Sequence, residues 1–154
     1  MSFLNNVYAD TRGKLRVVNI LKGRYIVVTN KKKGTIRGFH FNPEETKQLW
    51  CMRGRILVTT INMSKKSHGY LSVNRYIISG EKALLTKNHA IGYQTLENNT
   101  IVEYLIDKPY NQNKEIGIRY NDPYFNIKWR KLPLTISDKD LSYPNFKETK
   151  KCQK

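Results

Sequence analysis

Three side chains with useful chemistry lie close together in the sequence: Arg37, His40 and Lys47. The guanidinium group of arginine suits phosphate oxygens, and histidine can act as a base near neutral pH. Side chains three residues apart point to opposite faces of a straight strand. Gly38 lies between Arg37 and His40, where a bulge would re-aim one of them. We therefore interpret 35–41 as a bent strand that carries an anion binder and a base.

A histidine base works best with a carboxylate that fixes its tautomer and an acid on the other face of the substrate. Asp140 is one candidate for the carboxylate, and Tyr104, within the apolar run 101–105, is a candidate acid. Each also has an ordinary structural explanation, since a tyrosine in a strand usually packs and an aspartate near a chain end is usually solvated. The residues alone leave acid–base chemistry as a hypothesis.

The spacing of the other reactive residues argues against metal and cysteine chemistry. His40, His68 and His89 are not at metal-ligand spacing. Cys51 lies in an apolar run without an activating neighbour, and Cys152 lies in a charged segment. Two such cysteines make no disulfide framework, so we expect reduced thiols and no metal site.

Strand signals dominate the chain. We expect strands at 15–21, 24–29, 35–41, 48–52, 55–63, 71–78, 83–85, a short one ending at 95–96, 100–106 and 116–120. Short strands separated by turns are typical of an all-β sandwich or barrel. No window has a capped helical period, and 43–49 makes at most one turn. We predict one domain over 1–141 and a basic, flexible tail over 142–154.

The net charge is +16, from 28 Lys and Arg against 12 Asp and Glu. The basic clusters at 31–33, 65–66 and 147–154 fall in predicted loops and the tail, which favours solvated surface over a nucleic-acid site. No apolar run approaches the ~18 residues of a membrane helix, and the first residues lack signal-peptide features. We expect a cytoplasmic protein with no membrane partner.

In order and spacing, these segments resemble the dTDP-4-dehydrorhamnose 3,5-epimerase family of RmlC-like cupins. The resemblance runs from Asp10 to about Asp140. The matching motifs are Asp10-Thr11-Arg12-Gly13, Arg37-Gly38-Phe39-His40-Phe41, Lys47, Glu103-Tyr104, Tyr110, Glu115-Ile116-Gly117-Ile118, Asn121-Asp122-Pro123, Ile127-Lys128-Trp129 and Ile136-Ser137-Asp138-Lys139-Asp140.

The resemblance implies a cupin-type jelly roll, usually a homodimer, that needs neither metal nor dissociable cofactor. It implies a nucleotide-linked 4-keto-6-deoxy sugar as substrate, whose ketone acidifies the protons at C3 and C5. The roles it implies are a His40–Asp140 base dyad, Tyr104 as acid, Lys47 beside the enolate, Arg37 and Tyr110 on the diphosphate, and Arg12 at the nucleotide end.

The chain departs from the family pattern at several points. The family motif Ala-His-Gly-Phe reads Ala90-Ile91-Gly92-Tyr93 here, and His89 is a candidate substitute for the missing imidazole. An acid frequent in the preceding strand is replaced by Val58. Residues 14–17 lack the aromatic residues and glutamate that often follow the first motif, which leaves the nucleotide base open.

Two alternatives remain. A cupin 3,4-ketoisomerase also carries an Arg-Gly-x-His motif, but tends to have a second histidine where this chain has Asn42. A non-catalytic cupin that binds a sugar or a polyanion would account for the +16 charge. The segments Asn121-Asp122-Pro123 and Ser137-Asp138-Lys139-Asp140 favour an epimerase over the ketoisomerase, and the presence of His40, Asp140 and Tyr104 argues against the non-catalytic alternative.

Overall fold

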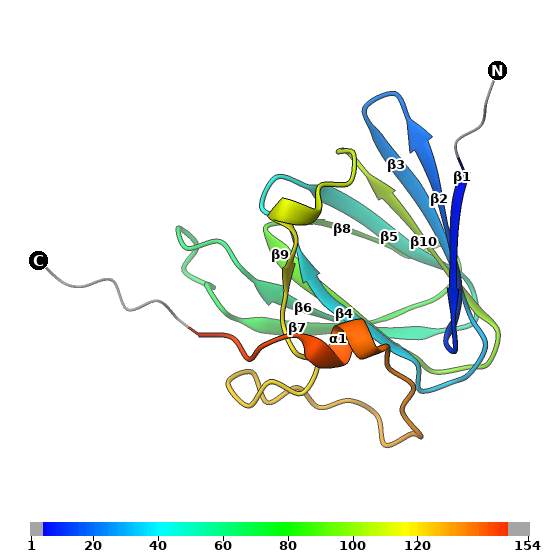
Figure 1. The fold of residues 1–154 in the computed structure, drawn as a ribbon. Helices are drawn as coiled ribbons and strands as arrows, with labels where there is room; N and C mark the ends of the chain where they lie inside the picture. The colour runs from blue at the N-terminus through cyan, green and yellow to red at the C-terminus, as the bar shows by residue number, and fades with distance from the viewer. Residues whose placement is uncertain (1–4, 148–154) are drawn as a thin grey trace, which may run out of the picture.

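The structure is a computed structural model that describes residues 5–147, and it consists of two antiparallel sheets (Figure 1). The six-stranded sheet has the order β1 (Asn5–Asp10), β2 (Gly13–Ile20), β3 (Gly23–Asn30), β10 (Thr100–Ile106), β5 (Thr46–Arg53) and β8 (Ala83–Lys87). The five-stranded sheet has the order β11 (Ile116–Gly117), β4 (Ile36–Phe41), β9 (His89–Thr95), β6 (Ile56–Asn62) and β7 (Val73–Ile78). This confirms the predicted all-β class.

Three elements were not predicted. β1 forms a hairpin with β2, in which Asp10 pairs with Gly13. The remaining two are a 3₁₀ turn, η1 (Gln112–Lys114), and a short helix, α1 (Asp138–Ser142). The Ser137 side chain caps α1 by accepting a hydrogen bond from the Asp140 backbone N–H. The one-turn helix considered at 43–49 is absent, because β5 already begins at Thr46.

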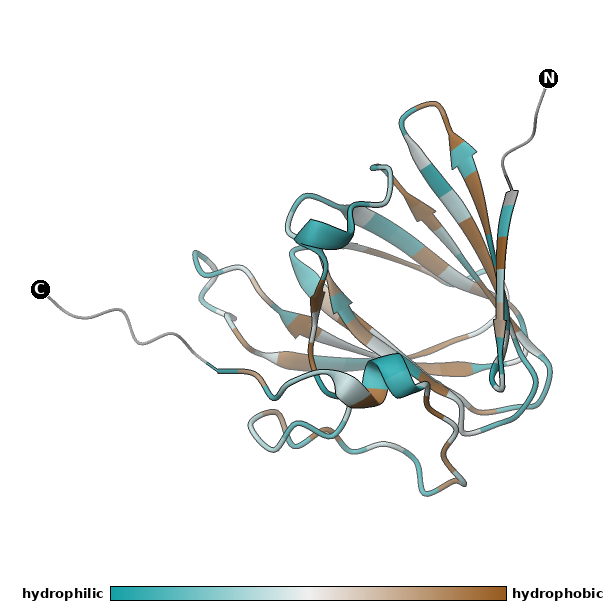
Figure 2. Ribbon diagram, viewed as in Figure 1, coloured by the Kyte–Doolittle hydropathy of each residue, from teal (hydrophilic) through white to brown (hydrophobic). Residues whose placement is uncertain are grey.

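The core lies between the two sheets. Alternate residues of the central strands point inward and form one apolar cluster: Val28, Leu49, Cys51, Ile56, Val58, Ile78, Ile91, Tyr93 and Val102. Figure 2 shows hydrophobic residues recurring along these strands. Any polar side chain at an inward position of this layer is therefore held in a mostly apolar surround.

The outer face of the five-stranded sheet is also covered. Phe39, Phe41, Ile61 and Ala90 form a second apolar cluster with Ile118, and Met63, Phe125, Ile127, Trp129 and Phe146 pack against it. Because Phe146 packs here, part of the segment predicted as a flexible tail lies against the domain. The rest of that predicted tail, residues 148–154, lies outside the described residues.

None of the helices within residues 5–147 is long and apolar enough to cross a membrane.

Candidate active site

The predicted bulge at Gly38 is present in β4. Arg37 pairs with Tyr93 and His40 pairs with Ile91, so β4 has one residue more than β9 between these pairs. Gly38 has φ +113°, and a Cβ there would lie 2.5 Å from the Ile91 carbonyl oxygen. Directly opposite residues share a sheet face. Since Tyr93 and Ile91 belong to the inner cluster, the bulge turns both Arg37 and His40 toward the space between the sheets.

His40 and Asp140 form a close pair inside the fold. Nε2 of His40 lies 3.0 Å from Oδ1 of Asp140, whose side chain is 2% exposed. The second carboxylate oxygen accepts hydrogen bonds from Arg12 Nη1 at 2.9 Å and from the Gly38 backbone N–H at 3.3 Å. Burial by itself raises the pKa of Asp140, but the hydrogen bond and charge of His40, then Arg12 and Gly38, outweigh burial and lower it. The carboxylate is thus held ionised.

The segment that carries Asp140 also covers one side of His40. The Tyr143 ring meets the His40 ring edge-on, at 5.7 Å between centroids and 84° between planes. A Cβ on Gly117 would overlap the Tyr143 ring, so glycine is required there. Burial, countered by Lys139 and supported by Glu115, raises the pKa of Tyr143 to about 12. Tyr143 therefore acts as a wall of the site with its proton retained.

Glu115 lies close to the same pair. Lys139 Nζ contacts its carboxylate at 2.9 Å. Burial raises the pKa of Glu115, but the charge of His40 and the contact with Lys139 more than offset this and lower it. Glu115 therefore adds negative charge near His40. Glu115 lies in one of the motifs that resemble the family, and no role was predicted for it.

Arg37 reaches across to the other sheet. It is 8% exposed, and its Nε donates a hydrogen bond to Asn30 Oδ1 at 2.8 Å. Asn30 in turn donates to the Tyr93 hydroxyl at 3.3 Å. Arg37 has no carboxylate partner within residues 5–147. Its charge acts on the nearby Asp10 without forming an ion pair, and a buried guanidinium that is only partly compensated favours an anionic ligand.

Tyr104 faces the same interior from β10, where it pairs with Ile26 and Leu49 and packs on the inner cluster. Its hydroxyl has no hydrogen-bond partner in the described part of the chain. Burial, and then the neighbouring Tyr93, raise the pKa of Tyr104 well above its ordinary value, while Arg37 opposes the shift. Tyr104 is thus a protonated phenol with its hydrogen available to a ligand.

Lys47 belongs to a buried charge cluster that the sequence analysis did not foresee. Its Nζ lies 3.3 Å from Oε2 of Glu45, and Oε1 of Glu45 accepts a hydrogen bond from Arg24 Nη2 at 2.9 Å. Arg24 also donates to the Lys108 carbonyl at 2.7 Å. Lys47 faces inward because Leu49, two residues later on β5, belongs to the inner cluster.

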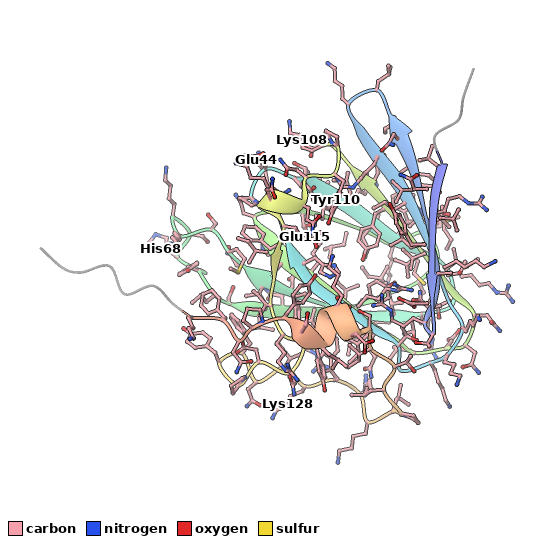
Figure 3. The ribbon with its side chains drawn as sticks, viewed as in Figure 1. Glu44, His68, Lys108, Tyr110, Glu115 and Lys128 are labelled. Carbon is pink, nitrogen blue, oxygen red and sulfur yellow. The ribbon has the colours of Figure 1, made fainter. Side chains whose placement is uncertain are left out.

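Tyr110 and Arg37, which were expected to bind the diphosphate together, lie in different parts of the structure. Tyr110 is exposed and lies over Arg24, 5.4 Å from the guanidinium carbon to the ring centroid. Tyr110 contacts Arg24 near the start of β3, whereas Arg37 contacts Asn30 at its end. The backbones of Arg24 and Asn30 are about 20 Å apart, at ~3.3 Å per residue. Tyr110 and Arg37 are therefore not brought together. Figure 3 labels Lys108, Tyr110 and Glu115 along the segment after β10.

Arg12 is largely engaged by carboxylates. Besides Asp140, it contacts Asp10, with Nη2 to Oδ2 at 2.6 Å. A small pocket between the β1–β2 hairpin and β4 is nevertheless lined by both Arg12 and Arg37, together with Asp10. Arg12 thus joins the dyad to the region where Arg37 would meet an anion.

The residues at which this chain departs from the family pattern pack in the core or bind the backbone. Ile91 and Val58 are buried in the inner cluster. His89 lies at the start of β9, and its Nδ1 is 2.7 Å from the Lys87 carbonyl oxygen. No contact joins His89 to His40 or Asp140 within residues 5–147.

Sequence reasoning missed Arg24, Asn30, Glu45, Glu115 and Tyr143 as neighbours of the site. Glu45 carried a signal, because a carboxylate two residues before Lys47 shares its strand face if the strand is extended. The other four contacts depend on how distant segments meet. Within residues 5–147, no three His, Cys, Asp or Glu side chains are grouped as metal ligands.

Comparison with known proteins identifies the family. Residues 6–148 match the family model described as dTDP-4-dehydrorhamnose 3,5-epimerase. The chain is 29% identical over 122 residues to the dTDP-4-dehydrorhamnose 3,5-epimerase of Sinorhizobium fredii, an alignment covering 75% of this chain and 63% of that protein. The chain thus spans less than two thirds of the length of this relative.

Solved structures agree on the fold. The dTDP-4-dehydrorhamnose 3,5-epimerase of Bacillus anthracis, with TDP and PPi bound, superposes with a TM-score of 0.75 at 27% identity, covering 92% of this chain and 91% of that one. A double mutant of ChmJ, a 3'-monoepimerase from Streptomyces bikiniensis, superposes with a TM-score of 0.73 at 18% identity, covering 94% of this chain and 85% of that one. These confirm the predicted cupin jelly roll, and the chain belongs to the dTDP-4-dehydrorhamnose 3,5-epimerase family.

Proposed function

We propose that this protein epimerises a nucleotide-linked 4-keto-6-deoxy sugar at C3, C5 or both, by removing and returning a proton next to the ketone. The observation that carries the proposal is the contact between His40 and the buried Asp140. A buried carboxylate at 3.0 Å stabilises the imidazolium that forms when histidine accepts a proton. Its second oxygen is held by Arg12 and Gly38, so the pair is rigid.

The proposed base step uses the other ring nitrogen of His40. With Nε2 turned to Asp140, Nδ1 takes the proton from the carbon beside the ketone. The His40 side chain is 33% exposed, which leaves it accessible to a ligand, unlike Asp140. The electrons of the broken C–H bond move into an enolate whose negative charge lies on the ketone oxygen.

Lys47 and Tyr104 supply the remaining steps. The Lys47 ammonium stabilises the enolate oxygen as the charge develops. Tyr104, from the opposite sheet to His40, returns a proton to the other face of the carbon, which inverts it. Support comes from the hydroxyl of Tyr104, which lacks an internal partner, and from its raised pKa, which keeps the proton in place.

The proposed diphosphate site centres on Arg37. Its burial without a carboxylate partner, and the pocket that it shares with Arg12, support an anion at this point. The S. fredii and B. anthracis relatives are named for a dTDP-linked substrate, and we propose the same class of nucleotide sugar here, with the base left open. The expected homodimer stays a prediction.

The proposal is tested by following deuterium from solvent into a nucleotide-linked 4-keto-6-deoxy sugar by NMR. We expect exchange at C3, C5 or both, followed by an inverted product. Substrates with thymidine and with other bases should be compared, because residues 14–17 differ from the family pattern. Absence of exchange with every base would contradict the proposal. Movement of the ketone from C4 to C3 in the product would instead identify a ketoisomerase.

A further inference from the structure

The buried cluster around Glu45 has an unusual composition for the interior of a sheet sandwich. The exposed fractions of the Glu45, Arg24 and Lys47 side chains are 2%, 6% and 12%. Two cations share one carboxylate, which leaves a formal charge of +1 in a low-dielectric surround. Buried charges are normally paired one to one. The excess positive charge of this cluster favours the binding of a ligand group that carries negative charge.

Glu45 fixes the place of the Lys47 ammonium. A lysine ammonium ends a flexible four-carbon chain, so its position depends on what holds it. Oε2 of Glu45 is 3.3 Å from Nζ, while Oε1 is occupied by Arg24. Glu45 thus holds Nζ as an ion pair, and Nζ donates no hydrogen bond to another group within residues 5–147, so its hydrogens remain for a ligand.

Arg24 in turn fixes Glu45. One of its terminal nitrogens holds the Glu45 carboxylate and the other donates to the Lys108 carbonyl at 2.7 Å. The guanidinium is therefore held between β3, the β4–β5 connection and the segment after β10. Arg24 and Lys47 both pair with Ile106, from the two sides of β10. The cluster thus spans three neighbouring strands at one level of the sheet.

Lys47 faces the same space as the proposed acid and base. Tyr104 lies two residues before Ile106 on β10 and so shares its sheet face. Lys47 and His40 both act on the ionisation of Glu115, which places the ammonium and the imidazole around a common region. Glu45 contacts Lys47 and Arg24, and contacts neither His40 nor Tyr104 in the described residues.

We propose that Glu45, held by Arg24, is a positioning residue that aims the Lys47 ammonium at the ketone oxygen of the sugar. This rests on the proposed function for the role of Lys47. Glu45 acts only through Lys47, so its removal should slow the chemistry and spare the binding of the nucleotide. The matched control is Glu44, an exposed neighbour whose carboxylate pairs with Lys114 at 2.9 Å (Figure 3).

A double-mutant cycle tests the proposal through deuterium exchange. We expect Glu45→Gln to lower the maximal exchange rate about 10–100-fold, because a misplacement of about 1 Å can cost that much. The dissociation constant for dTDP, which lacks the sugar, should stay within about twofold of wild type. In a Lys47→Ala background, Glu45→Gln should change the rate less than about twofold. Glu44→Gln should match wild type in both assays.

Other outcomes would overturn the proposal. If Glu45→Gln slows exchange equally with and without Lys47, or weakens dTDP binding as much as it slows exchange, Glu45 does not act through Lys47. Should Glu45→Gln lose its cooperative thermal transition, Arg24→Lys replaces it. This variant keeps the charge but loses one of the two contacts, and its smaller loss should also vanish in the Lys47→Ala background.

A measurement without turnover separates this inference from the proposed function. In ¹⁵N-lysine-labelled protein, an ordered ammonium gives a slowly exchanging NMR signal. We expect this signal for Lys47, assigned by its loss in Lys47→Ala, in wild type and Glu44→Gln but not in Glu45→Gln. A Lys47 signal that is absent from wild type, or unchanged in Glu45→Gln, contradicts the inference. Failure of wild type to exchange deuterium would contradict the proposed function instead.

Discussion

Asp140 and Glu45 are two buried carboxylates in closely similar settings with different partners. Each is bound on one oxygen by an arginine at 2.9 Å, Arg12 for Asp140 and Arg24 for Glu45. The other oxygen faces His40 in the first case and Lys47 in the second. An imidazole can take up and release a proton near neutral pH, whereas an ammonium offers a positive charge and several donors. Under the proposed function, the same kind of support serves a transferred proton at His40 and a fixed positive charge at Lys47.

The two clusters are also assembled differently. Glu45 and Lys47 are neighbours in the sequence, so the local course of the chain brings them together. Asp140 lies on α1, and reaches His40 and Gly38 only because residues 118–146 pack on the outer face of the five-stranded sheet. The Glu45–Lys47 pair therefore depends on one stretch of chain, whereas the His40–Asp140 pair depends on the docking of a distant segment.

The largest effect on activity is expected from replacing His40, the proposed base. His40→Ala should lower solvent deuterium exchange about 10²–10⁴-fold, the usual contribution of a general base. NMR of the nucleotide sugar in D₂O measures the rate. His89→Ala is the matched control and should retain exchange, since its ring contacts the Lys87 carbonyl. A loss in His89→Ala equal to that in His40→Ala would break the comparison, because proton transfer would then not belong to the Asp140 cluster.

Tyr104→Phe should separate proton removal from proton return. We expect deuterium still to enter the substrate, because His40 and Asp140 are intact, while formation of the inverted product falls about 10²-fold. Product stereochemistry by NMR and exchange are measured in the same sample. Tyr143→Phe, which loses a hydroxyl 3.5 Å from Glu115, serves as control and should invert normally. Inversion by Tyr104→Phe at the wild-type rate would assign the acid to another residue.

Arg37 sharpens the comparison, because it is a further buried cation and forms no ion pair with a carboxylate within residues 5–147. Arg37→Gln should raise KM for the nucleotide sugar about 10–100-fold, as expected for lost hydrogen bonds to a charged group. Initial rates over a range of substrate concentrations give the change in KM and kcat. Arg55→Gln, at an exposed arginine paired with Glu97, should leave KM unchanged. A fall in kcat with constant KM would place Arg37 in the chemistry rather than in binding.

The smallest effect concerns stability. Asp140→Asn should lower the free energy of unfolding at pH 7 by about 1–3 kcal/mol, because charged hydrogen bonds are lost while Arg12 keeps Asp10 as a partner. The pKa of Asp140 is lowered from 3.8 in the folded protein. Its contribution is therefore complete above about pH 4 and is lost as the pH falls through the lower folded value. Urea unfolding at pH 7 and pH 3 measures this, and a difference that grows in acid would contradict it.

The sequence predicted the fold class and most strands, because turn residues separate β-branched runs so clearly. It also predicted the bulge at Gly38, since only a break in the two-residue period lets Arg37 and His40 share a face. It missed β1, in which Val7, Tyr8 and Ala9 follow one another without alternation and which gains its structure by pairing with β2. It missed α1 because a five-residue helix has too few residues for a period.

The site shows the same division. The contact of His40 with Asp140 came from resemblance to a family, since spacing cannot bring together residues a hundred positions apart. Spacing likewise gave no sign that Tyr110 lies over Arg24 at a distance from Arg37, because both facts depend on how the segment after β10 crosses the sheets. Local strand geometry can be predicted from the spacing of residues in the sequence, whereas contacts between the layers depend on tertiary packing.

The position of Asp140 on α1 has a consequence for the growing chain. A ribosome releases the strands of both sheets before it releases α1, and domains generally begin to fold from the N-terminal side during synthesis. A nascent chain can therefore complete its sheets while His40 still lacks its contact with Asp140. Under the proposed function, catalytic competence arrives with the docking of α1, so a protein interrupted before Ser137 would be built like an epimerase and yet be inert.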